Sequence, residues 1–168
     1  SHYIIPGSFM AYNYAVTYGL GQLNVQPYEI KIHASDTSTT YGTAPFYTID
    51  ISGYQYEDDD TLVFDGSLAP TPDPNSQIPA GTHVIHPGGL TLKSPSNYFL
   101  TYEDGSLQVN PTELLVTADD QTRPYGFNNP NLTVQYNGFK YTDNEGSLST
   151  APIAQTPAQV SSLPGNYP

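Results

Sequence analysis

The sequence predicts an all-β protein made of tandem small β-sandwich repeats of 84 residues, and two observations carry this prediction. The first is composition: the chain holds fifteen Tyr, sixteen Pro and fourteen Gly, with one Met and no Trp. Tyr, Thr, Val and Ile favour strands, whereas Pro, Gly, Asn and Asp favour turns. No stretch sustains the apolar period of 3.6 residues that an amphipathic helix requires. The second observation is an internal repeat.

The repeat is clearest in two fifteen-residue stretches, "NYAVTYGLGQLNVQP" at 13–27 and "NYFLTYEDGSLQVNP" at 97–111, which lie 84 positions apart. The residues that follow match at the same offset: "EIKIHASDTSTTYG" at 29–42 corresponds to "ELLVTADDQTRPYG" at 113–126. One added residue then shifts the correspondence, so that Pro45 matches Pro130, Gly53 matches Gly138 and Tyr56 matches Tyr141. Such self-similarity at a fixed period is typical of repeat proteins.

The repeat divides the chain into three segments. Residues 28–111 form one complete copy of 84 residues, and residues 112–168 together with residues 1–27 supply the parts of a second copy. We therefore expect residues 112–168 to be the N-terminal part of a split repeat, which residues 1–27 of the next unit or subunit complete. The chain is then either one period of a covalent array or a subunit in a chain of exchanged strands. An arbitrary boundary is the third possibility, and complementary remainders of the right length disfavour it.

Individual strands follow from alternation. In Tyr98–Tyr102 the side chains of Tyr98, Leu100 and Tyr102 share one face, Glu103-Asp104-Gly105 forms a turn, and Leu107 and Val109 resume the apolar face. This pattern predicts a β-hairpin. In the first copy the hairpin that links neighbouring units has its apolar face at the following positions: Tyr14, Val16, Tyr18, Leu23 and Val25.

Further strands are expected at 30–34, 47–51, 82–86, 114–118 and 132–136, with turns at the Tyr-Gly pairs 41–42 and 125–126. The segment Glu57–Pro79 is too rich in proline for a central strand, and single helical turns are expected near 59–62 and 144–148. Six or seven short strands per copy predict a small immunoglobulin-like sandwich. A β-grasp arrangement is the alternative.

Three elements together resemble a known family: "VTADDQTRPYGFNNPNLTVQYNGF", the short "GNYP", and the closing pattern "NYxxTYxxGxLxVxP". They are similar to the MBG/YDG-type repeats of large bacterial secreted surface proteins and adhesins, and the resemblance covers essentially the whole chain. The chain departs from that pattern in having Tyr-Gly-Thr and Tyr-Gly-Phe where an acidic residue often follows Tyr-Gly. The resemblance implies an extracellular location, a structural or adhesive role, and no catalytic residues to carry over.

Charge and motifs exclude several other classes. Sixteen acidic against four basic residues give a net charge of −12, which disfavours nucleic acids and anionic membranes as partners. No run of 18 apolar residues predicts a membrane span, and there is no cysteine. The chain has no Gly-x-Ser-x-Gly elbow and no Gly-rich phosphate loop. We therefore expect no enzyme and no required cofactor.

Two weaker hypotheses remain for binding sites. Asp58, Asp59 and Asp60 offer clustered carboxylates to Ca²⁺, although their spacing does not match an EF-hand. Exposed tyrosines such as Tyr12 and Tyr54 could stack on sugars, which makes a carbohydrate-binding module the alternative function and surface glycans a possible class of partner. The tyrosines that match between copies are expected in the core or as hairpin partners.

Taken together, the sequence predicts a structural module of an extracellular bacterial fibre or adhesin stalk. Its partners are neighbouring copies of itself, joined head to tail through short proline-containing linkers at Gln26–Tyr28 and Asn110–Thr112.

Overall fold

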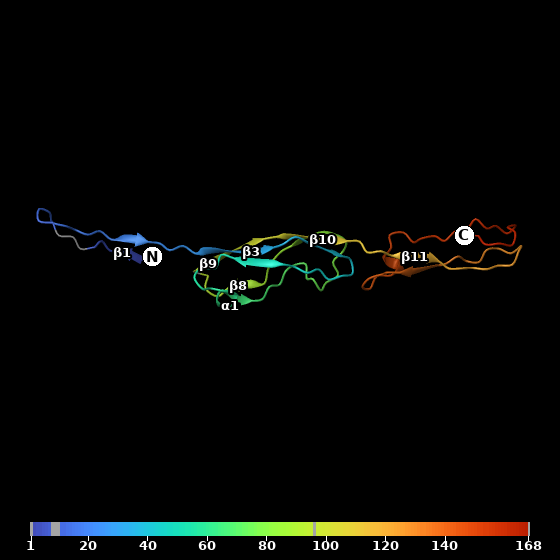
Figure 1. The fold of residues 1–168 in the computed structure, drawn as a ribbon, viewed down its shortest axis with the longest axis horizontal. Helices are drawn as coiled ribbons and strands as arrows, with labels where there is room; N and C mark the ends of the chain where they lie inside the picture. The colour runs from blue at the N-terminus through green and yellow to red at the C-terminus, as the bar shows by residue number, and fades with distance from the viewer. Residues whose placement is uncertain (1, 8–10, 96, 168) are drawn as a thin grey trace. The chain divides into compact units, whose positions relative to one another are not determined.

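The computed structural model describes residues 2–7, 11–95 and 97–167 and confirms the all-β prediction. Figure 1 shows the ribbon, in which extended chain and strands predominate. The strands are β1 (His2–Ile4), β2 (Gly21–Leu23), β3 (Tyr28–Ala34), β4 (Thr37–Thr40), β5 (Ile49–Ser52), β6 (Phe64–Gly66), β7 (Gly81–Ile85), β8 (Leu90–Leu92), β9 (Tyr98–Glu103), β10 (Gly105–Asn110), β11 (Leu115–Ala118) and β12 (Val134–Asn137). The described helices are one turn long: α1 (Asp60–Val63) and the 3-10 turn η1 (Glu145–Ser147). No described helix has the length and apolar character needed to cross a membrane.

The chain packs into two compact units. The first comprises Ser1–Ser35, Thr48–Thr71 and Ile85–Gly105. Its main sheet has the order β5-β3-β9, in which β3 runs antiparallel to β5 and parallel to β9. Strands β6 and β8 form a two-stranded sheet, and β1 pairs with β2 in another.

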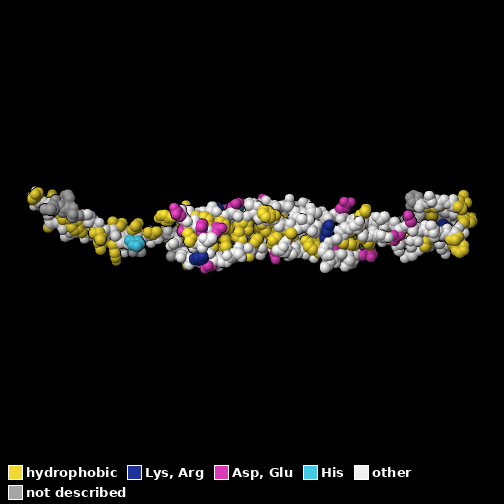
Figure 2. Space-filling view, turned by 60° about the horizontal axis from the view of Figure 1, so that its bottom comes forward, with side chains coloured by type: hydrophobic (Ala, Val, Ile, Leu, Met, Phe, Trp, Pro, Cys, Tyr) yellow, Lys and Arg dark blue, Asp and Glu magenta, His cyan; other side chains and the backbone are white. Residues whose placement is uncertain are grey.

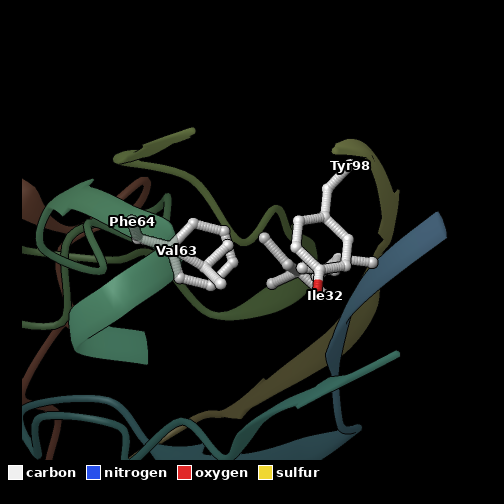
Figure 3. Packing of buried hydrophobic residues seen from close by; sticks show 5 residues of the cluster. Ile32, Val63, Phe64 and Tyr98 are labelled. Atoms are coloured by element: carbon white, nitrogen blue, oxygen red, sulfur yellow. The ribbon is translucent and has the colours of Figure 1, made fainter. Parts of the chain in front are cut away.

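The core of the first unit lies between the main sheet and the α1–β6 segment. Figure 3 shows Val63 and Phe64 facing Ile32 and Tyr98. These four side chains and Ile30 are buried. Ile30 and Ile32 point to the same face of β3 because side chains two positions apart share a face of a strand. The predicted apolar face of β9 is confirmed, since Tyr98, Leu100 and Tyr102 all pack in this core.

The second unit comprises Asp36–Tyr47, Pro72–Val84 and Ser106–Pro168. It holds a three-stranded sheet of order β4-β10-β7, with β10 parallel to β4, and the two-stranded antiparallel sheet β11-β12. Leu107 and Val109 of β10 are buried. The repeat boundaries at 28–111 and 112–168 stay a prediction from the sequence, because each contact-defined unit draws on several stretches of chain.

The predicted hairpin at 98–109 is wrong. Strand β9 pairs with β3 and strand β10 pairs with β4 and β7, so β9 and β10 belong to different sheets. The chain therefore continues through Asp104 instead of reversing. Gly105 makes this possible, since a Cβ atom there would lie 2.5 Å from the carbonyl oxygen of Ala34. The break between β3 and β4 is fixed in turn by Asp36, whose Oδ1 accepts a 2.7 Å hydrogen bond from the backbone N–H of Ser106.

The other predicted elements form close to their expected places. Strands β3, β5, β7, β11 and β12 start or end within two residues of the predicted ranges, and both Tyr-Gly pairs lie in turns. Both helical turns are present. Asp59 caps α1 by accepting hydrogen bonds from the N–H groups of Thr61 and Leu62, and Asn144 caps η1 by accepting one from Gly146.

Candidate assembly surfaces

We call residues 1–27 the leading segment, residues 28–111 the complete copy and residues 112–168 the trailing segment. The trailing segment repeats the backbone of the complete copy where both are present. Strand β3 pairs Ile32 with Ile51, and β11 pairs Val116 with Tyr136, which are the corresponding residues in the repeat. Tyr56 and Tyr141 also correspond, and both adopt a positive φ, 58° and 52°. The two copies thus share register as well as sequence.

The trailing segment lacks the strand that completes the sheet in the complete copy. There β3 has two neighbours, β5 and β9, whereas the sheet of β11 consists of β11 and β12 alone among the described residues. The consequence is exposure of apolar side chains. Ile32 is 0% exposed, and its counterpart Val116 is 38% exposed. The free edge of β11 presents unpaired backbone groups, which form a template for another strand.

The trailing segment also contains an open groove of about 820 Å³. Its lining includes residues 121–123, which correspond to the start of β4 in the complete copy. In the complete copy β4 pairs with β10, whose Leu107 and Val109 are 0% and 1% exposed. The groove therefore lies where the counterparts of these two side chains, Leu23 and Val25, are missing.

The leading segment carries the complementary apolar residues, and it exposes them. Leu23 and Val25 are 51% and 70% exposed, and Tyr14, the counterpart of the buried Tyr98, is 79% exposed. Val16 and Tyr18 are exposed as well. Residues 13–20 form no strand, and Gly21–Leu23 pairs with β1, so the predicted hairpin of this segment is not formed. Hydrophobic side chains that lie open to solvent are visible on the face shown in Figure 2.

A further contact joins the Tyr41–Gly42 turn to the trailing segment. The Tyr41 hydroxyl donates a 2.8 Å hydrogen bond to Oδ2 of Asp143, and the rings of Tyr41 and Tyr141 meet edge to face with centroids 5.4 Å apart. The bond to Asp143, followed by burial, raises the pKa of Tyr41 above its usual value. A Cβ on Gly42 would lie 2.5 Å from Cγ of Lys140, so the lysine stem packs directly on the glycine. Sequence reasoning placed the turn but gave no signal for this contact.

The three acidic residues proposed for calcium are engaged by neighbouring donors. Asp58 accepts a hydrogen bond from the Tyr98 hydroxyl, Asp59 caps α1, and Asp60 accepts one from Tyr54. The bonds from Thr61 and Leu62 lower the pKa of Asp59. No group of three potential metal ligands occurs among the described residues. Calcium binding stays a prediction, which a chelator that leaves the melting temperature unchanged would argue against.

The tyrosines divide differently from the expectation. Tyr12 is fully exposed, but Tyr54 is half-buried against Phe64, with ring centroids 6.2 Å apart. Tyr54 was therefore wrongly expected on the surface. Tyr56 was expected in the core and is fully exposed instead.

These features define a structural repeat protein: an all-β chain that writes one pattern twice, with matched strand register and matched Tyr-Gly turns. The chain belongs to the family of the MBG domain (YGX type), which matches residues 30–108 and again residues 114–168. The resemblance noted in the sequence is thereby confirmed. Domains of this family occur in surface proteins and are of structural or adhesive type, not enzymatic. Comparisons with curated proteins and with solved structures gave no match.

Proposed function

We propose that this protein is a structural module of an extracellular bacterial fibre or adhesin stalk, in which the copies join head to tail. The leading segment of one copy completes the trailing segment of its neighbour. One observation carries the proposal: residues that are buried in the complete copy have exposed counterparts in the two segments, and the two sets are complementary. Leu107 against Leu23 is the clearest pair, at 0% and 51% exposure.

The completed repeat follows from the register of the complete copy. Strand β9 runs parallel to β3 with Thr101 opposite Lys31. Thr17 and Leu115 are the corresponding residues, so residues 14–19 of the neighbour add to β11 as a parallel strand with Thr17 opposite Leu115. This mode of recognition is strand addition, in which main-chain hydrogen bonds and alternate side chains both contribute.

The apolar residues after that strand fill the groove. Strand β2 has one neighbour, β1, whereas β10 lies between β4 and β7. The free side of Gly21–Leu23 is therefore available to pair with residues 121–124, as β10 pairs with β4. Burial of Leu23 and Val25 in the 820 Å³ groove contributes roughly 1.5–3 kcal/mol each.

The membership in a family of surface proteins and the net charge of −12 both support an extracellular location. A high net charge keeps separate chains soluble and reduces non-specific association. Assembly then depends on the specific fit between the two segments.

The test compares two substitutions in the leading segment. Leu23→Asp places a carboxylate where the complete copy has a fully buried leucine, so we expect it to weaken head-to-tail association by roughly 100-fold or more. Leu20→Asp is the matched control. Leu20 is as exposed as Leu23, at 62% against 51%, and the complete copy already has an acid, Asp104, at its position.

Sedimentation velocity of the full chain measures the outcome. Linear oligomers of the 18.3 kDa chain are expected for the natural sequence and for Leu20→Asp, and monomers for Leu23→Asp. A natural chain that stays monomeric at every concentration, or equal behaviour of the two variants, would overturn the proposal.

A further inference from the structure

The contact of the Tyr41–Gly42 turn has two halves, a donor turn and a receiving loop. The donor half is the hydroxyl of Tyr41 with the bare backbone of Gly42. The receiving half is the loop from Lys140 to Asp143, in which Tyr141 is held at φ 52° and offers its ring. The strained φ of an aromatic residue is worth noting, because non-glycine residues rarely adopt it.

The repeat writes each half once more, and these second halves have no counterpart bound. The second donor turn is Tyr125–Gly126, where a Cβ on Gly126 would meet nothing within 4 Å and Tyr125 is 61% exposed. The second receiving loop runs from Gln55 to Asp58. Its Tyr56 is fully exposed although it holds the same positive φ, 58°.

The vacant receiving loop has room for the missing donor. Asp58 accepts the Tyr98 hydroxyl at Oδ2, with a donor–acceptor distance of 2.5 Å. A carboxylate has about four acceptor sites on its two oxygens, so a second phenol can bond to Asp58 while Tyr98 stays in place. Gln55 replaces Lys140 and is shorter, so it leaves the space that a Tyr-Gly turn occupies.

We propose that the Tyr125–Gly126 turn of one copy docks on the Gln55–Asp58 loop of the next copy and repeats between chains the contact that Tyr41 makes with Asp143. This inference rests on the proposed head-to-tail assembly and adds a second interface to it. The Tyr125 hydroxyl donates to Asp58, and its ring packs on Tyr56. The partner is a second copy of this chain.

The chain connectivity supports this placement. Residues 110–113 link the complete copy to the trailing segment, and residues 26–29 make the corresponding link from the leading segment to the complete copy. A trailing segment that is completed by the neighbour's leading segment is thus joined to the neighbour's complete copy as the complete copy is joined to the trailing segment. An interface between different surfaces of identical chains propagates along a line when the rotation between copies does not close a ring.

Cysteine crosslinking tests the docking, because the natural chain contains no cysteine. A Cβ on Gly42 would lie 3.0 Å from Cβ of Lys140, close to the spacing of about 3.5–4.5 Å in disulfides. The double variant Gly42→Cys with Lys140→Cys is the internal control and should form a bond within one chain. The test uses two single variants, Gly126→Cys and Gln55→Cys, oxidised separately and as a mixture.

We expect the mixture to yield a disulfide-linked dimer that joins position 126 of one chain to position 55 of another, identified by mass spectrometry of the linked peptides. The separate variants should yield several-fold less dimer. Both cysteines of each kind replace a residue of matched geometry, because Gly42 and Gly126 have φ of 92° and 83°. Equal yields in the mixture and in the separate variants would overturn the docking.

A second pair of variants measures the hydrogen bond without a crosslink. Tyr125→Phe removes the donor proposed to reach the next copy, and we expect about tenfold weaker association in sedimentation. Tyr41→Phe removes the same bond inside the chain and should leave association within about twofold of the natural chain.

The two proposals fail in different ways. Oligomers that form normally but give no 55–126 crosslink, with Tyr125→Phe unchanged, overturn the docking and leave strand completion in place. A chain that does not associate at all overturns both. A crosslink in the mixture that persists with Leu23→Asp added supports the docking and overturns strand completion as the main source of affinity.

Discussion

Gly105 holds the place where the chain passes from one sheet to another. A Cβ at this position would lie 2.5 Å from the Ala34 carbonyl oxygen and 2.8 Å from that of Ser35. We expect Gly105→Ala to lower the free energy of unfolding by roughly 1–3 kcal/mol, the usual cost of forcing atoms into a packed site. Urea unfolding of the full chain, followed by circular dichroism, measures this.

Gly19→Ala is the control for that substitution, because a Cβ on Gly19 would meet nothing within 4 Å. Its unfolding midpoint should stay close to that of the natural chain. Equal midpoints for the two alanine variants would show that the approach of Gly105 to β3 is not needed.

Tyr98 makes the stability of the core depend on alkaline pH. Its bond to Asp58, followed by burial, raises the pKa of the phenol. A group whose pKa is raised on folding contributes stability that is fully present below its unfolded pKa, about 10 for tyrosine, and lost as the pH rises through the folded pKa. We expect the melting temperature of the natural chain to fall above pH about 10, and that of Tyr98→Phe to fall less steeply.

Tyr12→Phe serves as the reference, because Tyr12 is fully exposed. Lysines also titrate in this range, so the informative quantity is the difference between variants across the pH series. Parallel curves for all three proteins would contradict the role given to Tyr98.

Side-chain environments followed from the sequence where alternation was clear, and failed where loops decided them. The apolar face of β9 was predicted because every second residue is large and apolar. The exposure of Tyr56 and the burial of Tyr54 were not, because a loop with a positive φ has no periodic pattern. A conserved size between two copies does not distinguish a core residue from one that contacts a neighbouring repeat.

Among the elements, β11 is the one whose environment should change on assembly. In the complete copy β3 bonds to strands on both sides, whereas β11 has β12 on one side. We expect alternate amides of Leu115–Ala118 to exchange rapidly with deuterium in monomers and slowly in oligomers. Amides of β3 should be protected in both states. Protection of β11 that is independent of protein concentration would argue against strand addition.

Strand positions were largely predictable, but their partners were not. The segments 98–103 and 105–110 have the alternation and the intervening turn residues of a hairpin. The chain instead pairs each with a strand some 70 residues earlier, β9 with β3 and β10 with β4. Local sequence encodes extended chain at these positions, whereas the pairing is decided by the burial of Ile32 against Tyr98 and by the close approach at Gly105. Neither contact is visible from sequence spacing.

For the whole chain, the net charge of −12 opposes association of one copy with the next. Salt screens this repulsion, since the Debye length falls from about 30 Å at 0.01 M to about 8 Å at 0.15 M. Assembly through apolar strand addition is therefore expected to tighten as salt rises over this range, as measured by sedimentation. Weaker association at higher salt would indicate that attraction between opposite charges holds the copies together.

The split of one repeat between two copies could be inferred from sequence, because the repeat offset is constant and the two remainders add to one period. The surfaces that the split leaves open could not be. Their definition needed the exposure of Leu23 beside that of Leu107, the groove at residues 121–123, and the free edge of β11.

An electron cryomicroscopy structure of the assembled chain tests strand completion most directly. We predict that residues 14–19 of one copy lie beside β11 of its neighbour as a parallel third strand, with Thr17 opposite Leu115 and with Leu23 and Val25 buried in the groove. A structure in which the edge of β11 stays bare, or is covered by any other segment while Leu23 remains in solvent, would contradict it.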